Sequence, residues 1–159
     1  MDNPLTRLPR KVQEALDRLG VEARVVELPA STRTAAEAAA AVGCRVGQIA
    51  KSLVFCGRES GNPALVIASG GNRVNEERLA QALGETAELA DPEAVRGWTG
   101  YPIGGVPPVG HAQPLPTYID EDLLGHAEIW AAAGTPRAVV RLTPDDLLRA
   151  TGGRVIAVV

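Results

Sequence analysis

Hydrophobic residues in the first third of the chain follow first a helical and then a strand spacing. Over residues 9–19 the apolar side chains recur every three or four positions, which predicts a helix, and the β-branched run at 23–28 predicts a short strand. Thr34, followed three residues later by Glu37, is a capping-box pattern, and Gly43 is placed to end the alanine-rich helix that this pattern opens. The chain therefore starts with a helix, a strand and a second helix.

The remaining two thirds alternate apolar runs with polar and glycine-rich turns. Strands are predicted at residues 51–56, 64–69, 117–119, 128–132, 137–142 and 154–158, and helices at 75–83, from 91 onwards and at 143–150. Several strands are joined by turns too short to hold a crossover helix, which favours antiparallel pairs. We expect an α+β fold with a mixed, largely antiparallel sheet and flanking helices.

Residues 97–116 break this pattern. The segment holds five glycines and five prolines, so it is neither regular helix nor central strand. An irregular stretch of about 20 residues inside a compact domain is typical of a functional loop, although a stiff surface connection is the alternative. Its glycines would let a ligand approach the main chain and leave N–H groups free for developing negative charge, while the prolines would hold the shape of the loop.

Length and composition indicate a single globular domain spanning residues 1–159. Compact domains run to about 100–200 residues, and the 45% of hydrophobic residues places the chain in the globular range. No apolar run approaches the roughly 18 residues that a membrane span needs, and residues 1–10 are too polar for a secretory signal. We therefore expect a cytoplasmic protein without a membrane partner.

Charge and residue content exclude several classes of function. The net charge is −3 and aromatic residues make up only 3%, which argues against a protein that coats nucleic acid nonspecifically, so an RNA partner would be bound locally. Cys44, Cys56, His111 and His126 are too few and wrongly spaced for a disulfide framework or a zinc site, and we expect no metal and no cofactor. Motifs for nucleotide hydrolysis, dinucleotide binding and serine hydrolysis are absent.

Lys51 opens an apolar strand and is the first candidate for chemistry. Of the 16 basic residues, only Lys11 and Lys51 are lysines, so a lysine here favours a site that requires an ammonium group. Such a group supplies a compact charge with three donors, able to hold a phosphate or to polarise an ester carbonyl. The structural alternative is a strand-end lysine whose stem lies on the core and whose ammonium reaches water.

Three segments, at residues 49–55, 99–110 and 115–120, together resemble the YbaK family of aminoacyl-tRNA deacylases. Members of this family are freestanding relatives of the editing domain of bacterial prolyl-tRNA synthetases, and the resemblance covers about residues 12–158. It implies the fold of that family, with a barrel-like sheet. It also implies metal-independent hydrolysis of the ester that joins a wrong small amino acid, such as alanine, cysteine or serine, to tRNA(Pro) or a related tRNA. The implied partners are the 3′ acceptor end of an aminoacyl-tRNA and a synthetase such as prolyl-tRNA synthetase.

The same resemblance assigns site residues. The essential lysine of the family matches Lys51, which would position the terminal adenosine, and the family's loop motif matches the segment from Gly104 to Pro108, whose main chain would hold the substrate. The substrate-binding residues implied in this way are Thr34, Gly104, Gly105, Val106, Pro107, Pro108, Gly110, His111, Ala132, Ala133 and Gly134. No general base stands out, so rate enhancement would come from positioning, from donors aimed at the oxyanion and from the substrate's own groups.

Some positions depart from the family's pattern. Thr34 stands where cysteine-clearing members carry Phe, and Ala132 and Val139 stand where they carry Ser and Asp, which leaves the amino acid specificity open. The alternative function is a non-catalytic module of the same fold that binds a nucleotide, an aminoacyl-adenylate or a protein partner. His111 either lines the pocket or is an ordinary buried or solvated histidine.

A basic stretch of the first predicted helix is the candidate for tRNA contact. Arg7, Lys11 and Arg18 lie near one face of that helix, where they would meet phosphates of the acceptor stem. A solvated helix face explains the same three charges equally well, and the sequence alone does not separate the two interpretations.

Overall fold

The computed structural model describes residues 4–159, and these residues form five α-helices and one eight-stranded sheet. The helices are α1 (Arg7–Arg18), α2 (Ala35–Val42), α3 (Glu76–Leu83), α4 (Pro92–Thr99) and α5 (Pro144–Thr151). The strands are β1 (Val25–Glu27), β2 (Ile49–Gly57), β3 (Pro63–Ser69), β4 (Ala87–Leu89), β5 (Thr117–Asp120), β6 (Ile129–Ala132), β7 (Ala138–Leu142) and β8 (Arg154–Ile156). Two short 3-10 helices, η1 (Val46–Gln48) and η2 (Glu121–Gly125), complete the elements.

Side chains at the helix starts and glycines at the helix ends fix boundaries close to those that the sequence predicts. The hydroxyl of Thr34 accepts a hydrogen bond from the N–H of Glu37 (3.1 Å), and Gly43 ends α2 in the left-handed conformation. The carboxylate of Asp91 caps α4, in which Pro92 occupies the first position. Local side-chain chemistry therefore determines where these helices begin and end.

The sheet is mixed and open. Its strand order is β1-β7-β6-β2-β3-β5-β8, with β4 paired to β2 in addition. Within residues 4–159, four strand pairings are antiparallel and three are parallel, which confirms the α+β class. The barrel-like closure is not found, because β1 and β8 are the opposite ends of the sheet. Each is only three residues long, so neither offers the ladder that closing a barrel requires.

The central strand β2 has a gap along one side. There, β6 pairs with Ile49 and Ala50, and β4 pairs with residues 55–57. Within the described chain, residues 51–54 therefore have no strand neighbour on that side, whereas β3 pairs with all of them on the other side. We call residues 51–54 the open edge of β2.

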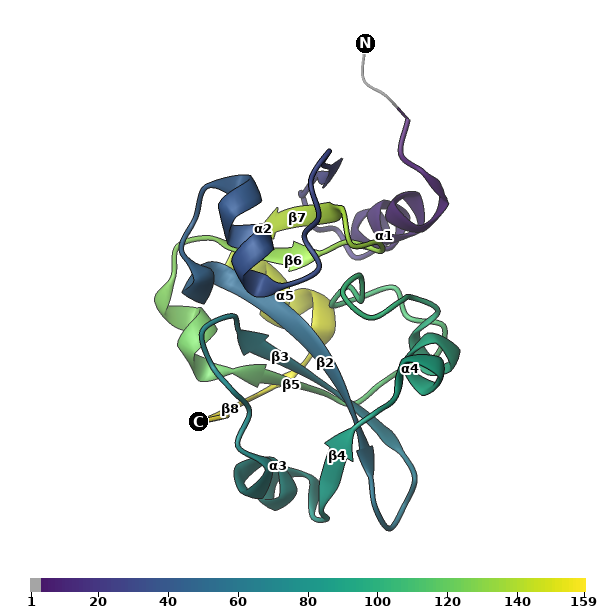
Figure 1. Cartoon of the computed structure of the whole chain (residues 1–159), viewed down its shortest axis with the longest axis vertical. Coiled ribbons are helices and arrows are strands. Elements are labelled where there is room, and N and C mark those ends of the chain that lie inside the picture. The colour runs from purple at the N-terminus through teal and green to yellow at the C-terminus, as the bar shows by residue number, and fades with distance from the viewer. Residues whose placement is uncertain (1–3) are drawn as a thin grey trace.

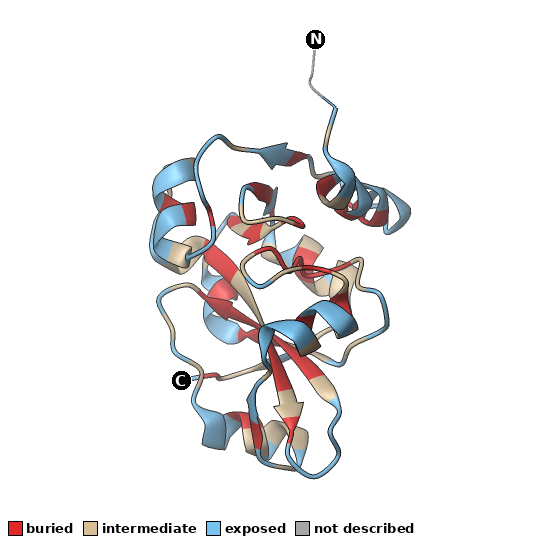
Figure 2. Cartoon of the chain, turned by 45° about the vertical axis from the view of Figure 1, so that its right-hand side comes forward, coloured by how far each residue is buried: buried red, intermediate tan, exposed pale blue. Residues whose placement is uncertain are grey.

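Helices pack around both ends of the sheet, as Figure 1 shows. β2 and β3 run through the middle of the molecule, with α1, α2, β6 and β7 around its upper half and α3 and β4 around its lower half. Buried residues concentrate on β2 and β3, while the helices turn exposed faces outward (Figure 2). The largest apolar cluster includes Leu65, Ile67 and Ile119 from neighbouring strands, and Tyr101 from the irregular loop, all fully buried.

Two elements differ from the sequence prediction. Strand β4 is too short, at three residues, to produce a recognisable alternation, and the sequence does not predict it. Gly97, expected in the irregular segment, lies in α4, where no atom is within 4 Å of the position of a β-carbon. The irregular segment therefore begins at Gly100. None of the helices formed by residues 4–159 combines the length and the hydropathy needed to cross a membrane.

Candidate functional site

A cavity of about 310 Å³ lies at the gap in the sheet. Its lining comes from residues 49–54 of β2, 89–90 at the end of β4, 130–132 of β6 and 32–35 at the start of α2, with Ala38, Val95, Ile103, Gly104, Val106 and Val139. Most of these side chains are apolar. The exposed ones, which border the opening, are Arg33, Thr34, Leu89 and Ile103.

Six residues that the sequence analysis singles out meet in this cavity. They are Thr34, Lys51, Gly104, Val106, Ala132 and Val139. Gly104 and Val106 come from one loop and the other four from separate parts of the chain, so the fold assembles the site from segments that carry separate parts of the family pattern. The remaining predicted site residues lie outside the lining and are placed below.

Lys51 is half-buried on β2, and its ammonium is the only lysine charge in the lining. Burial lowers the pKa of Lys51 from its ordinary value, and the negative charge of Asp120 opposes that shift. Lys51 pairs with Ala68 on β3, and the register of β3 with β5 sets Ala68 beside Asp120, so the two charged residues share one face of the sheet. The ion pairs found among residues 4–159 all lie elsewhere, which leaves the ammonium available to a ligand.

Asp120 is itself held rigidly. It is fully buried, and its carboxylate accepts hydrogen bonds from the N–H of Ser69 (2.9 Å), the side-chain amide of Asn72 (2.8 Å) and the N–H of Asp122 (2.9 Å). Such bonds satisfy a buried carboxylate without neutralising its charge. Asp120 therefore supplies a fixed negative charge at the end of β5, which is the neighbour of β3 on the side away from β2.

The open edge of β2 presents main-chain groups to the cavity. The carbonyl of Val54 accepts a hydrogen bond from the N–H of Ala90 (2.9 Å), so the main-chain groups of Val54 point away from β3. Main-chain groups of alternate residues on a strand point the same way, so the N–H and C=O of Ser52 also face this side. The ladder with β6 stops at Ala50, which leaves the groups of Ser52 without a strand partner in the described chain.

The glycines of the loop allow close packing against neighbouring main chain and side chains. Gly104 has a φ of 85°, and a β-carbon there would lie 2.8 Å from Cγ of Arg33. A β-carbon at Gly105 would lie 2.8 Å from Cα of Thr135. The N–H of Gly105 donates to Pro102 and its carbonyl accepts from Gly134 (2.9 and 2.8 Å). Gly105 therefore supports the loop, and its own polar groups are already occupied.

The second half of the loop, from Pro107 to His111, lies outside the cavity lining. Pro107 and Pro108 are buried. One ring nitrogen of His111 is 2.7 Å from the carbonyl oxygen of Pro107, and burial lowers the pKa of His111 while this hydrogen bond opposes the shift. The carbonyl of Gly110 accepts a hydrogen bond from the hydroxyl of Tyr101 (2.9 Å). These contacts hold the second half of the loop in place, and His111 is a half-buried, hydrogen-bonded histidine.

The turn between β6 and β7 contributes one lining residue, Ala132, and two supporting residues. The N–H of Ala133 donates to Ala138 (2.9 Å), and Ala133 is fully buried. Gly134 has a φ of 110°, and a β-carbon there would lie 2.9 Å from the carbonyl carbon of Leu8. This turn therefore bridges the loop on one side and the start of α1 on the other.

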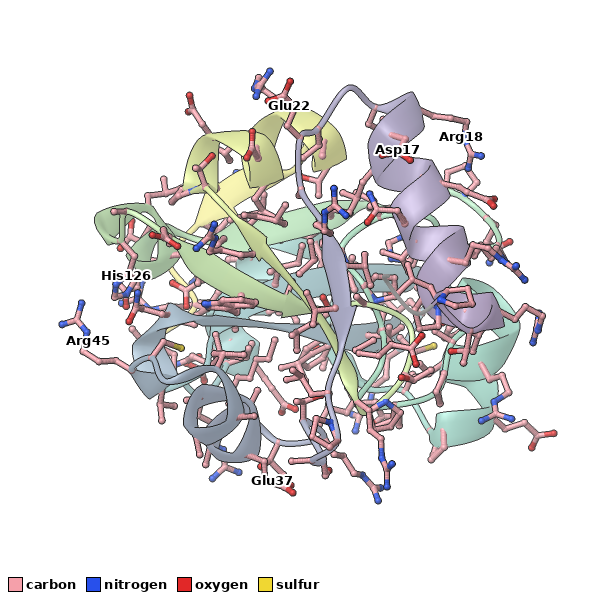
Figure 3. All side chains as sticks on the ribbon, turned by 90° about the horizontal axis from the view of Figure 1, so that it is seen from above. Asp17, Arg18, Glu22, Glu37, Arg45 and His126 are labelled. Carbon is pink, nitrogen blue, oxygen red and sulfur yellow. The ribbon has the colours of Figure 1, made fainter. Side chains whose placement is uncertain are left out.

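The three cations predicted for tRNA contact are exposed on α1 but do not line the cavity. The ammonium of Lys11 lies 5.4 Å from the ring centre of Tyr101, a cation–π contact that packs α1 onto the loop. Arg18 lies at the far end of α1 and points outward, on the opposite side of the molecule from Glu37 of α2 (Figure 3). Arg7 and Lys11 precede it on the same helix, so contact with tRNA stays a prediction for all three.

The sequence reasoning missed three polar lining residues, Thr32, Arg33 and Ser52. The hydroxyls of Thr32 and Ser52 are buried and have no hydrogen-bond partner in the described chain. An unsatisfied buried hydroxyl is costly, and most buried polar groups in proteins have a hydrogen-bond partner. Their only sequence signal is adjacency, since Ser52 follows Lys51 and Thr32 lies two residues before Thr34. No three His, Cys, Asp or Glu side chains of residues 4–159 are grouped so as to hold a metal ion.

The cavity suits a ligand that combines a small aliphatic side chain with groups that form hydrogen bonds. Apolar walls exclude water and favour a small aliphatic side chain, the open edge of β2 offers main-chain hydrogen bonds, and the ammonium attracts negative charge. A sequence model of the aminoacyl-tRNA editing domain matches residues 29–150. The chain belongs to the aminoacyl-tRNA editing family. The YbaK-type resemblance of its three segments is thereby confirmed.

Individual members of the editing family are similar over most of the chain. A crystal structure described as a candidate trans-editing enzyme for prolyl tRNA synthetase superimposes with a TM-score of 0.91 at 54% identity, covering 97% of this chain and 98% of that one. YwhH of Bacillus subtilis, whose function is uncharacterised, is 33% identical over 77% of this chain and 78% of its own length. EbsC of Enterococcus faecalis, named as a candidate Cys-tRNA(Pro)/Cys-tRNA(Cys) deacylase, is 32% identical over 76% of this chain and 74% of its own.

The editing domain also occurs inside longer relatives. A proline–tRNA ligase of Nitratidesulfovibrio vulgaris is 33% identical over 80% of this chain, but that match spans only 23% of the ligase. The similarity therefore concerns one part of the synthetase.

Proposed function

We propose that this protein is a trans-acting editing hydrolase that releases a mischarged small amino acid from tRNA. The observation that carries the proposal is the cavity at the gap in the sheet, in which Lys51, the open edge of β2 and apolar walls face one another. Family membership supports the reaction class, since the matching domain edits aminoacyl-tRNA. A tRNA substrate implies work in the cytoplasm.

In the proposed reaction, Lys51 positions the terminal adenosine, and its ammonium donates hydrogen bonds to the acceptor atoms of that nucleoside. The amino acid enters the cavity, where the N–H of Ser52 and the main chain at Gly104 and Val106 are available to the ester carbonyl. Water adds to that carbonyl and gives up a proton, the bond to the ribose oxygen breaks, and the ribose oxygen takes up that proton. An aminoacyl ester is already activated, so positioning and oxyanion stabilisation suffice without a dedicated base.

Alanine is the preferred amino acid in this proposal. Ala132 and Val139, which replace the Ser and Asp of cysteine-clearing members, both line the cavity and make that part of its wall apolar. A serine hydroxyl or a cysteine thiol would meet aliphatic groups there, whereas a methyl group fits without losing a hydrogen bond. We accordingly rank alanine above cysteine and serine, with tRNA(Pro) as the first tRNA to test.

The test is hydrolysis of tRNA(Pro) charged in turn with alanine, cysteine, serine and proline by the purified protein. We expect fast release of alanine, slower release of cysteine and serine, and retention of proline, with activity unchanged by a chelator. Failure to hydrolyse every member would contradict the proposal. Binding of an aminoacyl-adenosine mimic, seen as a thermal shift without hydrolysis, would instead select the non-catalytic binding module. A physical association with prolyl-tRNA synthetase can be measured on the same preparations.

A further inference from the structure

The cavity has a one-sided charge distribution. Arg33 and Lys51 are its charged lining residues, and no Asp or Glu of the described chain lines it. The protein as a whole has a net charge of −3, so a lining with two cations and no carboxylate departs locally from its composition, although Asp120 lies close enough to act on the charge of Lys51. Such a site attracts an anionic part of a ligand.

Arg33 occupies a prepared position at the opening. Its stem crosses Gly104, whose missing side chain makes the room, since a β-carbon there would lie 2.8 Å from Cγ of Arg33 and 3.4 Å from its carbonyl oxygen. The glycine that begins the loop motif thus admits this arginine. The guanidinium belongs to an exposed residue, and Arg33 takes part in none of the ion pairs found among residues 4–159.

The two cations sit at different depths. Lys51 is half-buried on the central strand, whereas Arg33 is exposed at the border of the cavity. If the amino acid fills the apolar interior, the nucleotide that carries it must pass the opening, and its 5′ phosphate is the first anionic group outside. A guanidinium binds a phosphate with two parallel hydrogen bonds, which an exposed arginine can form without being desolvated beforehand.

We propose that Arg33 binds the phosphate that joins the terminal adenosine of the tRNA to the preceding nucleotide, an inference that rests on the proposed function. Arg33 is then a substrate-binding residue that acts on the nucleic acid rather than on the amino acid. Its contribution depends on the presence of that phosphate, which distinguishes it from a residue that shapes the cavity.

Two minimal substrates separate these roles. Alanyl-adenosine carries the ester but no phosphate, and cytidylyl-adenosine esterified with alanine carries the single phosphate in question. We expect Arg33→Gln to lower kcat/KM for the dinucleotide ester by about 10- to 100-fold, the size of losing a charge-assisted hydrogen bond, and to leave the adenosine ester within about twofold. Arg33→Lys, which keeps the charge but not the fork, should fall between.

The matched control is Arg154→Gln, which removes the same charge from the exposed start of β8, three strands away from β2 in the sheet. It should act on both esters as the unsubstituted protein does. With full-length alanyl-tRNA, Arg33→Gln should also reduce the slope of log kcat/KM against log salt concentration by about 0.7, the value for one lost contact to a single strand. Thermal unfolding shows that the variants fold.

Equal losses on both esters, or no loss on either, would overturn the role of Arg33. The proposed function itself would be refuted if the unsubstituted protein hydrolysed neither alanyl-tRNA, nor either minimal ester, nor any member of the mischarged panel. The two failures are therefore distinguishable, because only the first leaves an active parent enzyme.

Discussion

Replacing Gly105 by alanine is expected to loosen the loop that borders the cavity. The added β-carbon would lie 2.8 Å from Cα of Thr135 and 2.9 Å from its N and C atoms, whereas ordinary contacts begin near 3.4 Å. All three atoms are main chain, so no side-chain rotation relieves the contact. The loop and the turn between β6 and β7 must separate by about 0.6 Å, which stretches the hydrogen bond from Gly134 to Gly105.

The expected cost combines two terms. Overpacking of this kind costs about 1–3 kcal/mol, and the weakened hydrogen bond adds about 1 kcal/mol. For a domain of this size the sum corresponds to a fall in Tm of about 6–12 °C. Gly104 and Val106 flank the altered residue and line the cavity. Because small displacements of positioning groups are costly, we expect kcat/KM to fall by about 10- to 100-fold.

Urea unfolding and hydrolysis of alanyl-tRNA measure the two effects on the same sample. Gly97→Ala is the matched control, since Gly97 lies in α4 with open space around its α-carbon and alanine is favoured in a helix by up to about 1 kcal/mol. The control should be slightly more stable than the parent and equally active. A Gly105→Ala protein with parental stability and activity would show that contact with the turn does not hold the loop in place.

Three further substitutions test the site. Lys51→Ala should reduce the hydrolysis rate at least about a hundredfold with little change in Tm, and near-normal rates would remove its assigned role. Burial lowers the pKa of His111 in the folded protein, so as the pH falls below about 6.5 this histidine takes up a proton in the unfolded chain before it does so in the folded one. The free energy of unfolding should therefore decline between pH 7.5 and 5.5. The decline should be smaller in His111→Gln. Val139→Ala widens the cavity and should raise kcat/KM for 2-aminobutyryl-tRNA relative to alanyl-tRNA about tenfold; an unchanged ratio would exclude Val139 from amino acid selection.

Local signals in the sequence account for most of the fold. Thr34 caps the start of α2 and Gly43 ends it. A capping hydroxyl and a left-handed glycine act only on neighbouring residues, so both boundaries are visible in the local sequence. The parallel pairing of β2 with β6 could not be predicted in the same way, since Ala50 and Ala131 are 81 residues apart and their contact depends on the whole chain. The open edge of β2 follows from that pairing, and it too was beyond the reach of local patterns.

The sequence predicted the lining residues that belong to the family pattern, but not the other polar residues that line the cavity. Lys51 stands out by its rarity and by the strand that follows it, and the structure places it in the cavity. Arg33 and Thr32 carry no such mark, because their relation to the cavity comes from the path of the chain over Gly104. The resemblance also implied substrate contact for Gly105 and His111, which lie outside the cavity lining. Both main-chain polar groups of Gly105 and one ring nitrogen of His111 have partners within the protein, and their contact with substrate stays a prediction.

The open edge of β2 has a consequence for how such enzymes diversify. Every residue type except proline presents the same main-chain N–H and C=O, so amino acid replacements at Ser52 leave the main-chain groups that face the cavity chemically constant. The walls come from other elements, with Val95 on α4, Val106 on the loop and Val139 on β7. In the proposed reaction, exchange of one wall residue therefore changes which amino acid side chain is accepted and leaves these main-chain groups unaltered.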